Sequence, residues 1–438
     1  MSTQPAFSTD SALAKQLEAA QVGLFENGAF QPVSVVETPY RLSATLWQVA
    51  WRTAQSLGEL FSAVSRNRSW LSQALLGSES SSLSSQLLRR LPEKLLPQNN
   101  VLLTRHDLML DRKQQWRLIE SNSIAAGMGP FSEKLSHLLA VDTEWSFAPN
   151  EASVRQAEGL YRAATELRGV QNPVVVFVVE ANENNVYDQK MLADALTRLG
   201  ATVLFKTLHE LKSERVENQE NLLSLCHVGI VDLLYFRTGY NLDDYNDEFG
   251  DARSLLNFRG ELEYLNVKLC PSIAGQLATH KWVQRQLSLL SVSDLMAQFQ
   301  LTVQPAIQAY LALQLNYKSV DSTSLKKDLN SGNWLIKTTA EGGGNVHDSF
   351  NNLPELDALQ HPFLMQKIQP FIRKEPVVFQ RGQRRFTLTG TVSELGLFTV
   401  GDDHRYAGYL LRTKAVDELE CGVHKGYGAI DSVIIVAH

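Results

Sequence analysis

The chain has 438 residues, more than one simple hydrophobic core accommodates, so two or three packed subdomains are expected. Its 44% hydrophobic and 20% charged residues are typical of a globular protein. With 47 acidic and 41 basic residues the net charge is −6, which gives no electrostatic footprint for nucleic acid or an anionic membrane. Any anionic ligand must therefore be bound by a local basic cluster.

Cysteine content and the apolar segments indicate the compartment. The three cysteines, Cys226, Cys270 and Cys421, have neither metal-ligand spacing nor the number that a disulfide framework needs, so a reducing environment is expected. Residues 1–25 lack the apolar segment of a secretory signal, and no run of about 18 apolar residues predicts a membrane span. We expect a cytoplasmic protein with no membrane or nucleic-acid partner.

The first third of the chain is predicted to be mainly helical. Leu42 to Leu75 has strong helical periodicity, and Ser-rich Gly77 to Ser85 after it is predicted to be a surface loop. A second amphipathic helix is expected over Val154 to Leu167, with Asn150 or Ser153 as its N-cap.

The middle of the chain alternates strands and helices. Val174 to Val179 is a continuous apolar run of the kind that forms a strand buried on both faces. A helix is expected over 190–199, a strand over 202–205 and a third apolar strand over 228–236. This alternation predicts a parallel α/β domain over about 171–275.

The last third carries a helical stretch at 276–300, followed by strand-like runs separated by turn residues. These runs are Trp334 to Lys337, Phe363 to Ile368, Arg385 to Val392 and Tyr406 to Arg412. Their connections are too short for crossover helices, so the strands are expected to be antiparallel. The chain is therefore predicted to combine α/β and α+β architecture.

A glycine-rich segment gives the strongest local signal for chemistry. A strand ends at Lys337, and Glu341 precedes Gly342, Gly343, Gly344 and Asn345. Glycines allow the backbone N–H groups to approach an anion, a lysine binds phosphate, and a carboxylate binds Mg²⁺. A flexible hairpin explains three glycines equally well, and the order of residues excludes a Walker A loop.

An acidic pair and several basic residues supply the other groups that ATP with Mg²⁺ requires. Glu120 and Asn122 project from the same face of a predicted strand, where both oxygens can reach one cation, although an exposed strand face explains them too. Arg412 and Lys414 also share one side of a strand. Lys281 and Lys367 are further candidates, each of which taken alone is an ordinary surface charge.

Seven ordered sequence blocks occur between about Leu103 and the C-terminus. They are Glu120-x-Asn122-x-Ile124-Ala125, Asn185-x-Tyr187-Asp188-Gln189, Tyr235-Phe236-Arg237-x-Gly239-Tyr240, Cys270-Pro271-x-Ile273-Ala274-x-Gln276-Leu277-Ala278 before Lys281, Lys337 with Glu341 to Asn345, Ser393-Glu394-Leu395-Gly396-x-Phe398, and Leu410-Leu411-Arg412-Thr413-Lys414-Ala415. In these blocks and their order the chain resembles the eukaryotic-type glutathione synthetases.

The resemblance implies an ATP-grasp core with an antiparallel sheet and lid loops, built from residues 1–170 and 276–438, with the inserted parallel domain at 171–275 binding substrate. The lids are expected at about 337–350 and 420–428. In such enzymes ATP phosphorylates the C-terminal carboxylate of γ-glutamylcysteine, and glycine attacks the acyl phosphate. The family is commonly homodimeric, so a homodimer is expected. Residues before about 100 match weakly and receive no chemical role.

Roles are carried over by position from the resemblance. Two Mg²⁺ ions would be held by Glu120, Asn122 and Glu341, and Arg412, Lys337 and Glu341 would be catalytic. The ATP-binding set would be Glu120, Lys281, Lys337, Glu341, Gly342, Gly343, Gly344, Asn345, Asp348, the adenine hinge Met365, Gln366, Lys367 and Ile368, then Glu394, Lys414 and Glu420. The substrate-binding set would be Arg105, Ile124, Ala125, Ala126, Gly127, Glu183, Asn184, Asn185, Gln189, Arg237, Thr238, Gly239, Tyr240, Arg412, Val423 and His424.

The sequence departs from the family pattern at the peptide and acceptor sites. Gly127 stands where the family usually has a serine, and Asp348 where it often has a tyrosine. In the second loop the family's Ala-Ala corresponds to His424-Lys425. The acceptor amine therefore stays open between glycine and another amine, and a catalytically silent ligand-binding homologue is the third alternative.

Overall fold

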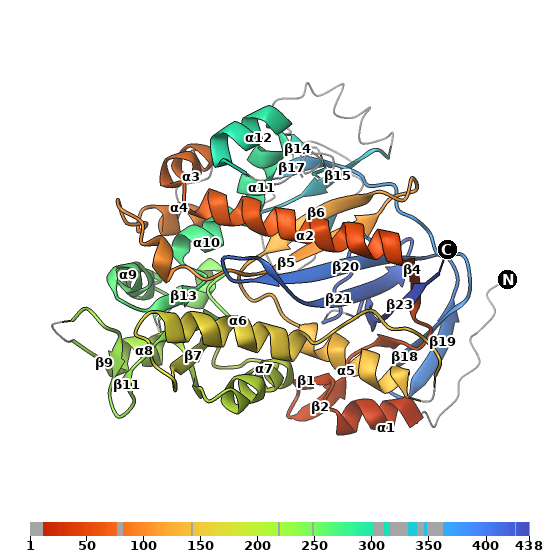
Figure 1. Ribbon diagram of the computed structural model, residues 1–438, viewed down its shortest axis with the longest axis horizontal. Helices are drawn as coiled ribbons and strands as arrows, with labels where there is room; N and C mark the ends of the chain where they lie inside the picture. The colour runs from red at the N-terminus through yellow and green to blue at the C-terminus, as the bar shows by residue number, and fades with distance from the viewer. Residues whose placement is uncertain are drawn as a thin grey trace.

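The computed structural model describes residues 12–76, 82–141, 143–217, 220–247, 249–301, 311–312, 314–315, 332–339, 346–347, 362–424 and 426–437. Within these ranges a large twisted sheet runs through the middle of the molecule, with a long helix along one face and two further helices along the other (Figure 1). In the described part no helix is both long and apolar enough to cross a bilayer. The fold is mixed α/β, as the strand and helix periodicities predict.

The large sheet has eight strands in the order β19-β18-β3-β22-β21-β20-β5-β6. Its strands are β3 (Val35–Val36), β5 (Leu103–Leu110), β6 (Trp116–Asn122), β18 (Val377–Arg381), β19 (Arg384–Leu388), β20 (Thr391–Val400), β21 (Arg405–Ala415) and β22 (Ala429–Asp431). All neighbours pair antiparallel except β22 and β3. Strands from both ends of the chain thus build one sheet, which confirms the antiparallel pairing expected for the last third.

Alternating side chains divide the core between the two faces of this sheet. Helix α2 (Ala44–Ser65) packs on β5 and β20, and Leu411 of β21 belongs to that core cluster. Helices α5 (Gly129–Ala140) and α6 (Ala152–Glu166) pack on β21, where the adjacent Leu410 joins the second cluster. The next residue on the Leu410 face is Arg412, so this face becomes polar as β21 continues.

A second sheet is wholly parallel. It runs β13 (Lys268–Cys270), β12 (Leu233–Phe236), β7 (Val174–Val178) and β8 (Thr202–Lys206). Helix α7 (Val186–Arg198) connects β7 to β8. The predicted strands at 174–179 and 202–205 are confirmed, whereas the run 228–236 is divided between β12 and the short strand β11 (Gly229–Ile230) of a separate sheet.

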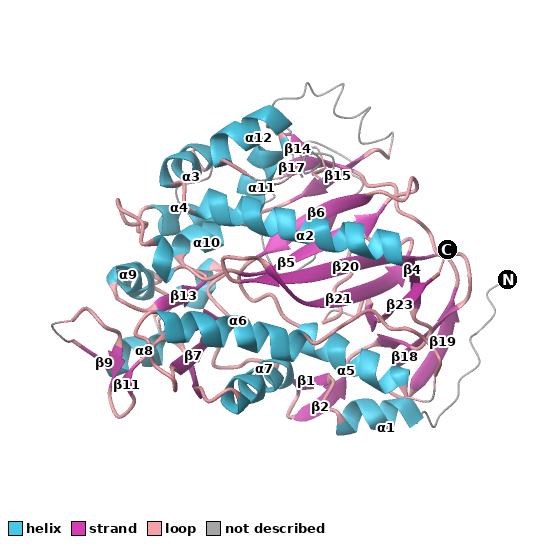
Figure 2. Cartoon of the chain, viewed as in Figure 1, coloured by secondary structure: helices cyan, strands magenta, loops and turns pink. Residues whose placement is uncertain are grey.

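A third, smaller sheet lies beside a group of short helices (Figure 2). It is antiparallel, in the order β14 (Gln314–Leu315), β17 (Phe363–Gln366), β15 (Trp334–Lys337) and β16 (Val346–His347). The predicted helical stretch 276–300 is interrupted, because separate serine and histidine caps start new helices. It comprises the end of α10 (Ile273–Ala278), then α11 (Lys281–Ser288) and α12 (Val292–Phe299).

The remaining elements surround these three sheets. They are α1 (Ala12–Ala19), β1 (Gly23–Glu26), β2 (Ala29–Pro32), β4 (Tyr40–Ser43), α3 (Arg68–Ala74), α4 (Leu83–Leu88), η1 (Pro97–Asn99), α8 (Leu208–Glu214), β9 (Arg215–Val216), β10 (Ser224–Leu225), η2 (Leu242–Tyr245), α9 (Arg253–Glu261), η3 (Leu262–Tyr264) and β23 (Val433–Val436). Where the Ser-rich loop was expected to continue, Ser82 caps α4 and the helix begins at Leu83.

The predicted N-caps of the helix over 154–167 are wrong. Glu151 occupies the N-cap position of α6 and makes no side-chain capping bond, and the Ser153 N–H in the first turn donates to Glu133 Oε2 at 2.6 Å. The Asn150 amide donates instead to Ser132 Oγ and to the Tyr409 carbonyl, each at 3.2 Å, and accepts from the Tyr409 N–H. Asn150 therefore stabilises the contact between helix and sheet, a role that no local pattern indicates.

Candidate active site

Glu120 lies at the end of β6, where the large sheet meets the small one. Its Oε2 atom is 3.3 Å from Lys337 Nζ on β15, and the Asn122 amide donates to its Oε1 atom at 3.4 Å. The predicted shared face of Glu120 and Asn122 is confirmed. Burial alone would raise the pKa of Glu120, but Lys337, Lys281 and two arginines outweigh it and hold this pKa well below its ordinary value.

This arrangement fits a magnesium ion bound together with phosphates. Mg²⁺ prefers oxygen ligands and commonly takes one or two carboxylates, with phosphates and water completing the octahedron. Glu120 offers an ionised carboxylate, and the hydrogen bond from Asn122 uses the amide nitrogen and not its oxygen. The described residues contain no group of three or more His, Cys, Asp or Glu side chains suited to a metal. A Mg²⁺ ion bound here would therefore take some of its coordinating oxygens from the bound phosphates and from water.

A second cluster lies on β20 and β21 of the same sheet. Glu394 accepts from Arg412 Nη2 at 3.1 Å and from Lys414 Nζ at 3.3 Å, which confirms that the two cations share one face. Lys414 also donates to the Leu419 carbonyl at 2.8 Å, which holds the predicted ATP residue Glu420 near by. Cys421 is buried here, with its Sγ 3.7 Å from the Arg412 carbonyl oxygen, and burial raises the pKa of its thiol.

Sequence reasoning missed Asp107, the residue that connects Arg105 with Arg412. Asp107 of β5 is fully buried and accepts two hydrogen bonds from Arg105, at 2.7 and 2.9 Å. Its Oδ2 atom also lies 3.0 Å from Arg412 Nη2, across the intervening strand β20. The contact is possible because Gly396 lies between them, where a Cβ would be 2.5 Å from Asp107 Oδ1. The period-two spacing of Arg105 and Asp107 is the one signal that the sequence offered.

The predicted peptide-binding turn, Ile124 to Gly127, joins the large sheet to the parallel sheet. The carbonyl of Gly127 accepts from Arg105 at 3.4 Å, and the Ala125 N–H donates to the carbonyl of Phe236 at the end of β12. A Cβ on Gly127 would lie 2.6 Å from Arg237 Nη2, so glycine permits this close approach. Ala125 has a φ of 51°, a left-handed conformation uncommon for alanine.

Behind the turn, Arg237 forms a buried pair with an acid that the candidate list did not include. Its Nη2 atom is 3.4 Å from Asp188 Oδ2 on α7. The Arg237 Nε, Asp188 Oδ1 and Asn185 Oδ1 atoms are buried without a hydrogen-bond partner. Unpaired buried polar atoms are uncommon in folded proteins, so these three mark a place where a polar ligand would complete the bonding.

Other predicted substrate residues flank this pair. Glu183 accepts from the Asn185 N–H at 2.7 Å and from the Gln189 amide at 2.6 Å. Thr238 is buried beside Arg237, and the Tyr240 N–H donates to Asp244. Gly239 accepts from the Gln276 amide at 2.7 Å. Asn184 is exposed, and its contact in the structure is through the backbone: its carbonyl accepts a hydrogen bond from the Phe25 N–H.

His424 lies within the electrostatic influence of Arg237 and Glu183 on one side of the candidate site and of Arg105 and Arg412 on the other. It keeps an exposed surface, yet desolvation of its ring and the charge of Arg237 lower the pKa of His424 to about 4, against the opposing effect of Glu183. The arginines Arg105 and Arg412 act in the same direction. The imidazole is therefore neutral near pH 7. Val423 beside it is buried in the core under α5 and α6.

The structure describes some of the remaining predicted residues. Met365 is buried in the small sheet, Gln366 is exposed, and the Lys367 N–H donates to the carbonyl of Asn333 at 2.7 Å, with Ile368 packed against that sheet. Several residues singled out by the sequence lie outside the described residues, namely Glu341, Gly342, Gly343, Gly344, Asn345, Asp348 and Lys425.

Comparisons with known proteins identify the family. Residues 8–435 match the family described as eukaryotic glutathione synthase, ATP binding domain. The chloroplastic glutathione synthetase of Solanum lycopersicum is 28% identical over 440 residues, covering 92% of this chain and 78% of that protein. The glutathione synthetase of Rattus norvegicus is 26% identical over 444 residues, covering 92% and 90%.

The fold has a solved counterpart. The apo structure of a glutathione synthetase-like effector from Globodera pallida superposes with a TM-score of 0.69 at 14% identity, covering 97% of this chain and 95% of the other, which shows a shared fold. The match of residues 8–435 shows the family, and its members in the comparisons are named as synthetases. The chain therefore belongs to the eukaryotic glutathione synthase family and is an ATP-dependent ligase.

Proposed function

We propose that this protein joins γ-glutamylcysteine to glycine in an ATP- and Mg²⁺-dependent reaction that releases ADP and phosphate. The observation that carries the proposal is the convergence on Glu120. This one ionised carboxylate, with Asn122 beside it, is placed among Lys337, Lys281 and the arginine cluster. A triphosphate with Mg²⁺ needs both signs of charge at one place, and this arrangement provides them.

In this proposal the core is an ATP-grasp fold formed by residues 1–170 and 276–438, with 171–275 as the substrate domain. All four strands of the parallel sheet fall within 171–275, which supports the division. ATP would lie between the large and small sheets, with its adenine at the hinge Met365 to Ile368. Glu341, Gly342 to Asn345 and Asp348 would close over the phosphates as a lid.

Charge neutralisation would make the γ-phosphoryl group transferable. Lys281, Lys337 and Lys414 would hold phosphate oxygens, and Glu120, Asn122 and Glu341 would hold two Mg²⁺ ions. Bound Mg²⁺ supplies charge stabilisation to the phosphate oxygens of the transferring group. Glu394 would lie near the nucleoside, with Glu420 close by.

The reaction would then proceed in two displacements. A carboxylate oxygen of the peptide attacks the γ-phosphorus, the bond to ADP breaks, and an acyl phosphate forms. The amine nitrogen of glycine attacks the acyl carbon, the C–O bond to phosphate breaks, and the amine loses a proton. Arg412 is fixed by Asp107 and Glu394, and in this proposal its guanidinium would stabilise the negative charge that develops on the reacting group.

The peptide would bind between Arg105 and Arg237. Arginine binds carboxylates with two parallel hydrogen bonds, and the unpaired atoms beside Arg237 are suited to the polar end of a γ-glutamyl group. The full proposed set adds the turn Ile124 to Gly127, Glu183 to Asn185, Gln189, Thr238 to Tyr240, and the loop residues Val423 and His424.

The deciding experiment measures ADP release by the purified chain with γ-glutamylcysteine, glycine, ATP and Mg²⁺, with the tripeptide identified by mass spectrometry. Without glycine, added hydroxylamine should trap the acyl phosphate as a hydroxamate. Glu120→Gln should abolish both products while leaving the circular dichroism spectrum unchanged. No turnover with any amine would reject the ligase proposal and favour a silent ligand-binding homologue.

A second candidate differs only in the acceptor. His424 lies among the residues proposed to bind peptide and amine, where the resembling family has a small residue, and it is neutral near pH 7. Its bulk would narrow the acceptor pocket, which favours glycine. The same assay with β-alanine and other amines tests this: turnover well above that with glycine would establish a ligase with another acceptor.

A further inference from the structure

Strand β6 is the last strand of the large sheet, and a glutamine side chain forms hydrogen bonds with one residue on its outer edge. Gln284 of α11 accepts from the Ser121 N–H at 2.9 Å and donates to the Ser121 carbonyl at 3.0 Å. One amide thus satisfies both backbone groups of a residue, as a neighbouring strand does. Ser121 is the residue between Glu120 and Asn122.

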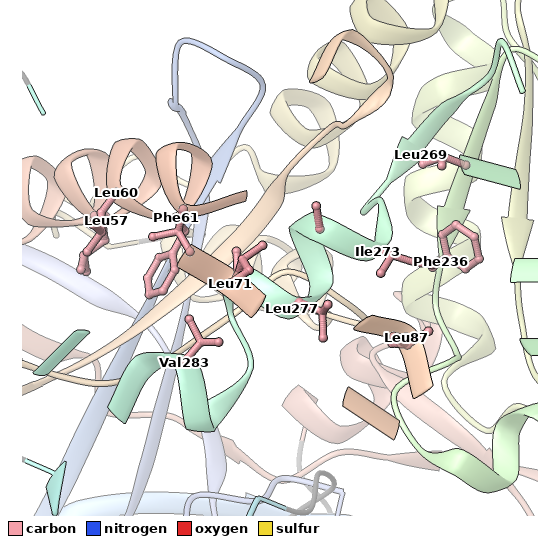
Figure 3. Packing of buried hydrophobic residues seen from close by; sticks show 14 of the residues in the cluster. Leu57, Leu60, Phe61, Leu71, Leu87, Phe236, Leu269, Ile273, Leu277 and Val283 are labelled. Atoms are coloured by element: carbon pink, nitrogen blue, oxygen red, sulfur yellow. The ribbon is translucent and has the colours of Figure 1, made fainter. Parts of the chain in front are cut away.

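Gln284 is held rigidly where it makes these bonds. Its Nε2 atom also donates to the Thr279 carbonyl at 2.6 Å, and the residue is 4% exposed. Its neighbour Val283 is buried in the core cluster with Phe61 and Leu277 (Figure 3). The amide is therefore attached to a packed helix and not to a mobile loop.

A second contact joins the residue after β6 to α10 and its C-cap Thr279, just before α11. The hydroxyls of Ser123 and Thr279 are 2.7 Å apart, and Ser123 Oγ donates to the Gly275 carbonyl at 3.1 Å. Helix α11 begins with Lys281, whose positive charge acts on Glu120. The end of β6 is thus bonded to α10 and its C-cap through Ser123 and to α11 through Gln284, which also bonds Thr279 shortly before Lys281.

We infer that Gln284 is a positioning residue for the metal–nucleotide site, fixing Glu120 and Asn122 against Lys281 so that the carboxylate, the amide and the ammonium act on one ligand. The inference rests on the proposed function, which assigns Mg²⁺ and phosphate to those side chains. Residues that orient metal ligands typically contribute about 10- to 100-fold in affinity. Without the Gln284 amide, Ser121 loses its outer hydrogen bonds and the carboxylate beside it is less firmly positioned, so the advantage that the metal gives to nucleotide binding is reduced.

The test measures binding of the non-hydrolysable ATP analogue AMP-PNP to the full chain by titration calorimetry, with Mg²⁺ and with EDTA. The Kd measured in EDTA divided by the Kd measured with Mg²⁺ gives the factor by which the metal strengthens nucleotide binding. Gln284→Met should reduce this ratio at least tenfold relative to the wild type. A purely structural role would weaken binding equally under both conditions and leave the ratio unchanged.

Gln156→Met is the matched control, because Gln156 is 2% exposed and its amide donates to the Ala407 carbonyl at 3.2 Å, under the second core cluster. This variant should keep the wild-type ratio. If Gln284→Met does not fold, Gln284→Glu replaces it: the carboxylate still accepts from Ser121 but no longer donates to the Ser121 carbonyl.

The outcomes separate this inference from the proposed function. A folded Gln284 variant with the wild-type ratio overturns the inference even if the wild type is an active ligase. A wild type that binds AMP-PNP more tightly with Mg²⁺ but ligates no amine refutes the proposed function and leaves the inference standing. A wild type whose nucleotide binding gains nothing from Mg²⁺ overturns the inference as well.

Discussion

Asp107 is the most constrained single residue of the candidate site. It has no solvent exposure, and it is paired with Arg105 on its own strand and with Arg412 two strands away. A buried carboxylate shared by two guanidiniums fixes both, since neither can rotate without losing a charge-assisted bond. Its role is therefore to orient the two arginines proposed to handle substrate charge.

Replacing Asp107 by asparagine should remove this orientation. We expect about 3 kcal/mol of lost stability in urea unfolding, near the lower end for a broken buried pair because both arginines keep some solvent contact. The value of kcat/KM for the peptide should fall about 100-fold through misplaced groups. Asp232→Asn is the control, since Asp232 is a buried partner of Arg168 outside the site. Equal kinetic loss in both variants would refute an orienting role for Asp107.

Gly396→Ala tests the same contact without changing a charge. The added Cβ would lie 2.5 Å from Asp107 Oδ1 and 2.8 Å from Arg105 Cδ, so the ion pair must move. Overpacking typically costs about 1–3 kcal/mol, and we expect kcat/KM to fall about tenfold or more. Steady-state kinetics beside thermal unfolding checks this, and unchanged kinetics would mean that the pair yields without functional loss.

At the scale of elements, the β5–β6 hairpin carries both a buried histidine and the proposed metal ligands. His106 of β5 contacts Ser121 Oγ at 2.8 Å and Thr399 Oγ1 at 3.1 Å, and its ring stacks on Phe61. Burial, with a smaller effect of His404, lowers the pKa of His106 to about 3. The hairpin therefore folds with a neutral imidazole inside it.

This histidine should make the protein sensitive to acid. The unfolded chain binds a proton on His106 near pH 6.5, whereas the folded chain does not until about pH 3, so stability is complete above pH 6.5 and decreases below it. One such proton contributes up to about 1.4 kcal/mol per pH unit. In urea unfolding between pH 7 and 4, His106→Gln should show a smaller slope than the wild type. Parallel slopes would contradict the prediction.

Elements and single faces were predictable because they depend on local periodicity. Period-two spacing predicted that Glu120 would share a face with Asn122, and Arg412 with Lys414. Asn122 bonds Glu120 directly, and Arg412 and Lys414 both bond Glu394. The partnership of Asp107 with Arg412 was not predictable, because it requires the strand order β5-β20-β21. The Asn150 cap was wrong for the same reason: a partner distant in sequence, Tyr409, takes its side chain.

At the scale of the whole molecule, one side-chain contact spans the boundary between the large and small sheets. Lys337 ends β15, is 6% exposed, and reaches Glu120 on β6. The proposed ATP site lies at this boundary, so the two sheets would be held together by a ligand as well as by their own contacts. The charge of Lys337 also keeps Glu120 ionised.

Lys337→Met should disable nucleotide use while the fold persists. Removing a cation that faces phosphate in the transition state typically costs about 3 kcal/mol or more, so kcat/KM for ATP should fall at least 100-fold. Lys268→Met is the matched control: Lys268 is 8% exposed and pairs with Glu166 at 3.5 Å, away from the site. Near-normal ATP kinetics in Lys337→Met would exclude a phosphate contact.

The two ends of the large sheet have a consequence for self-association. A bare edge strand offers unpaired backbone groups that can recruit a strand from another chain and start aggregation. At one end β19 presents exposed Arg384 and Arg385, whose charges repel a second copy. At the other end the Gln284 amide occupies the outward N–H and carbonyl of Ser121 on β6, and Leu118 of β6 forms a bridge with Leu311. The side chain inferred to align a nucleotide site thus also prevents a foreign strand from pairing with Ser121, so one residue serves both the proposed chemistry and the protection of this edge.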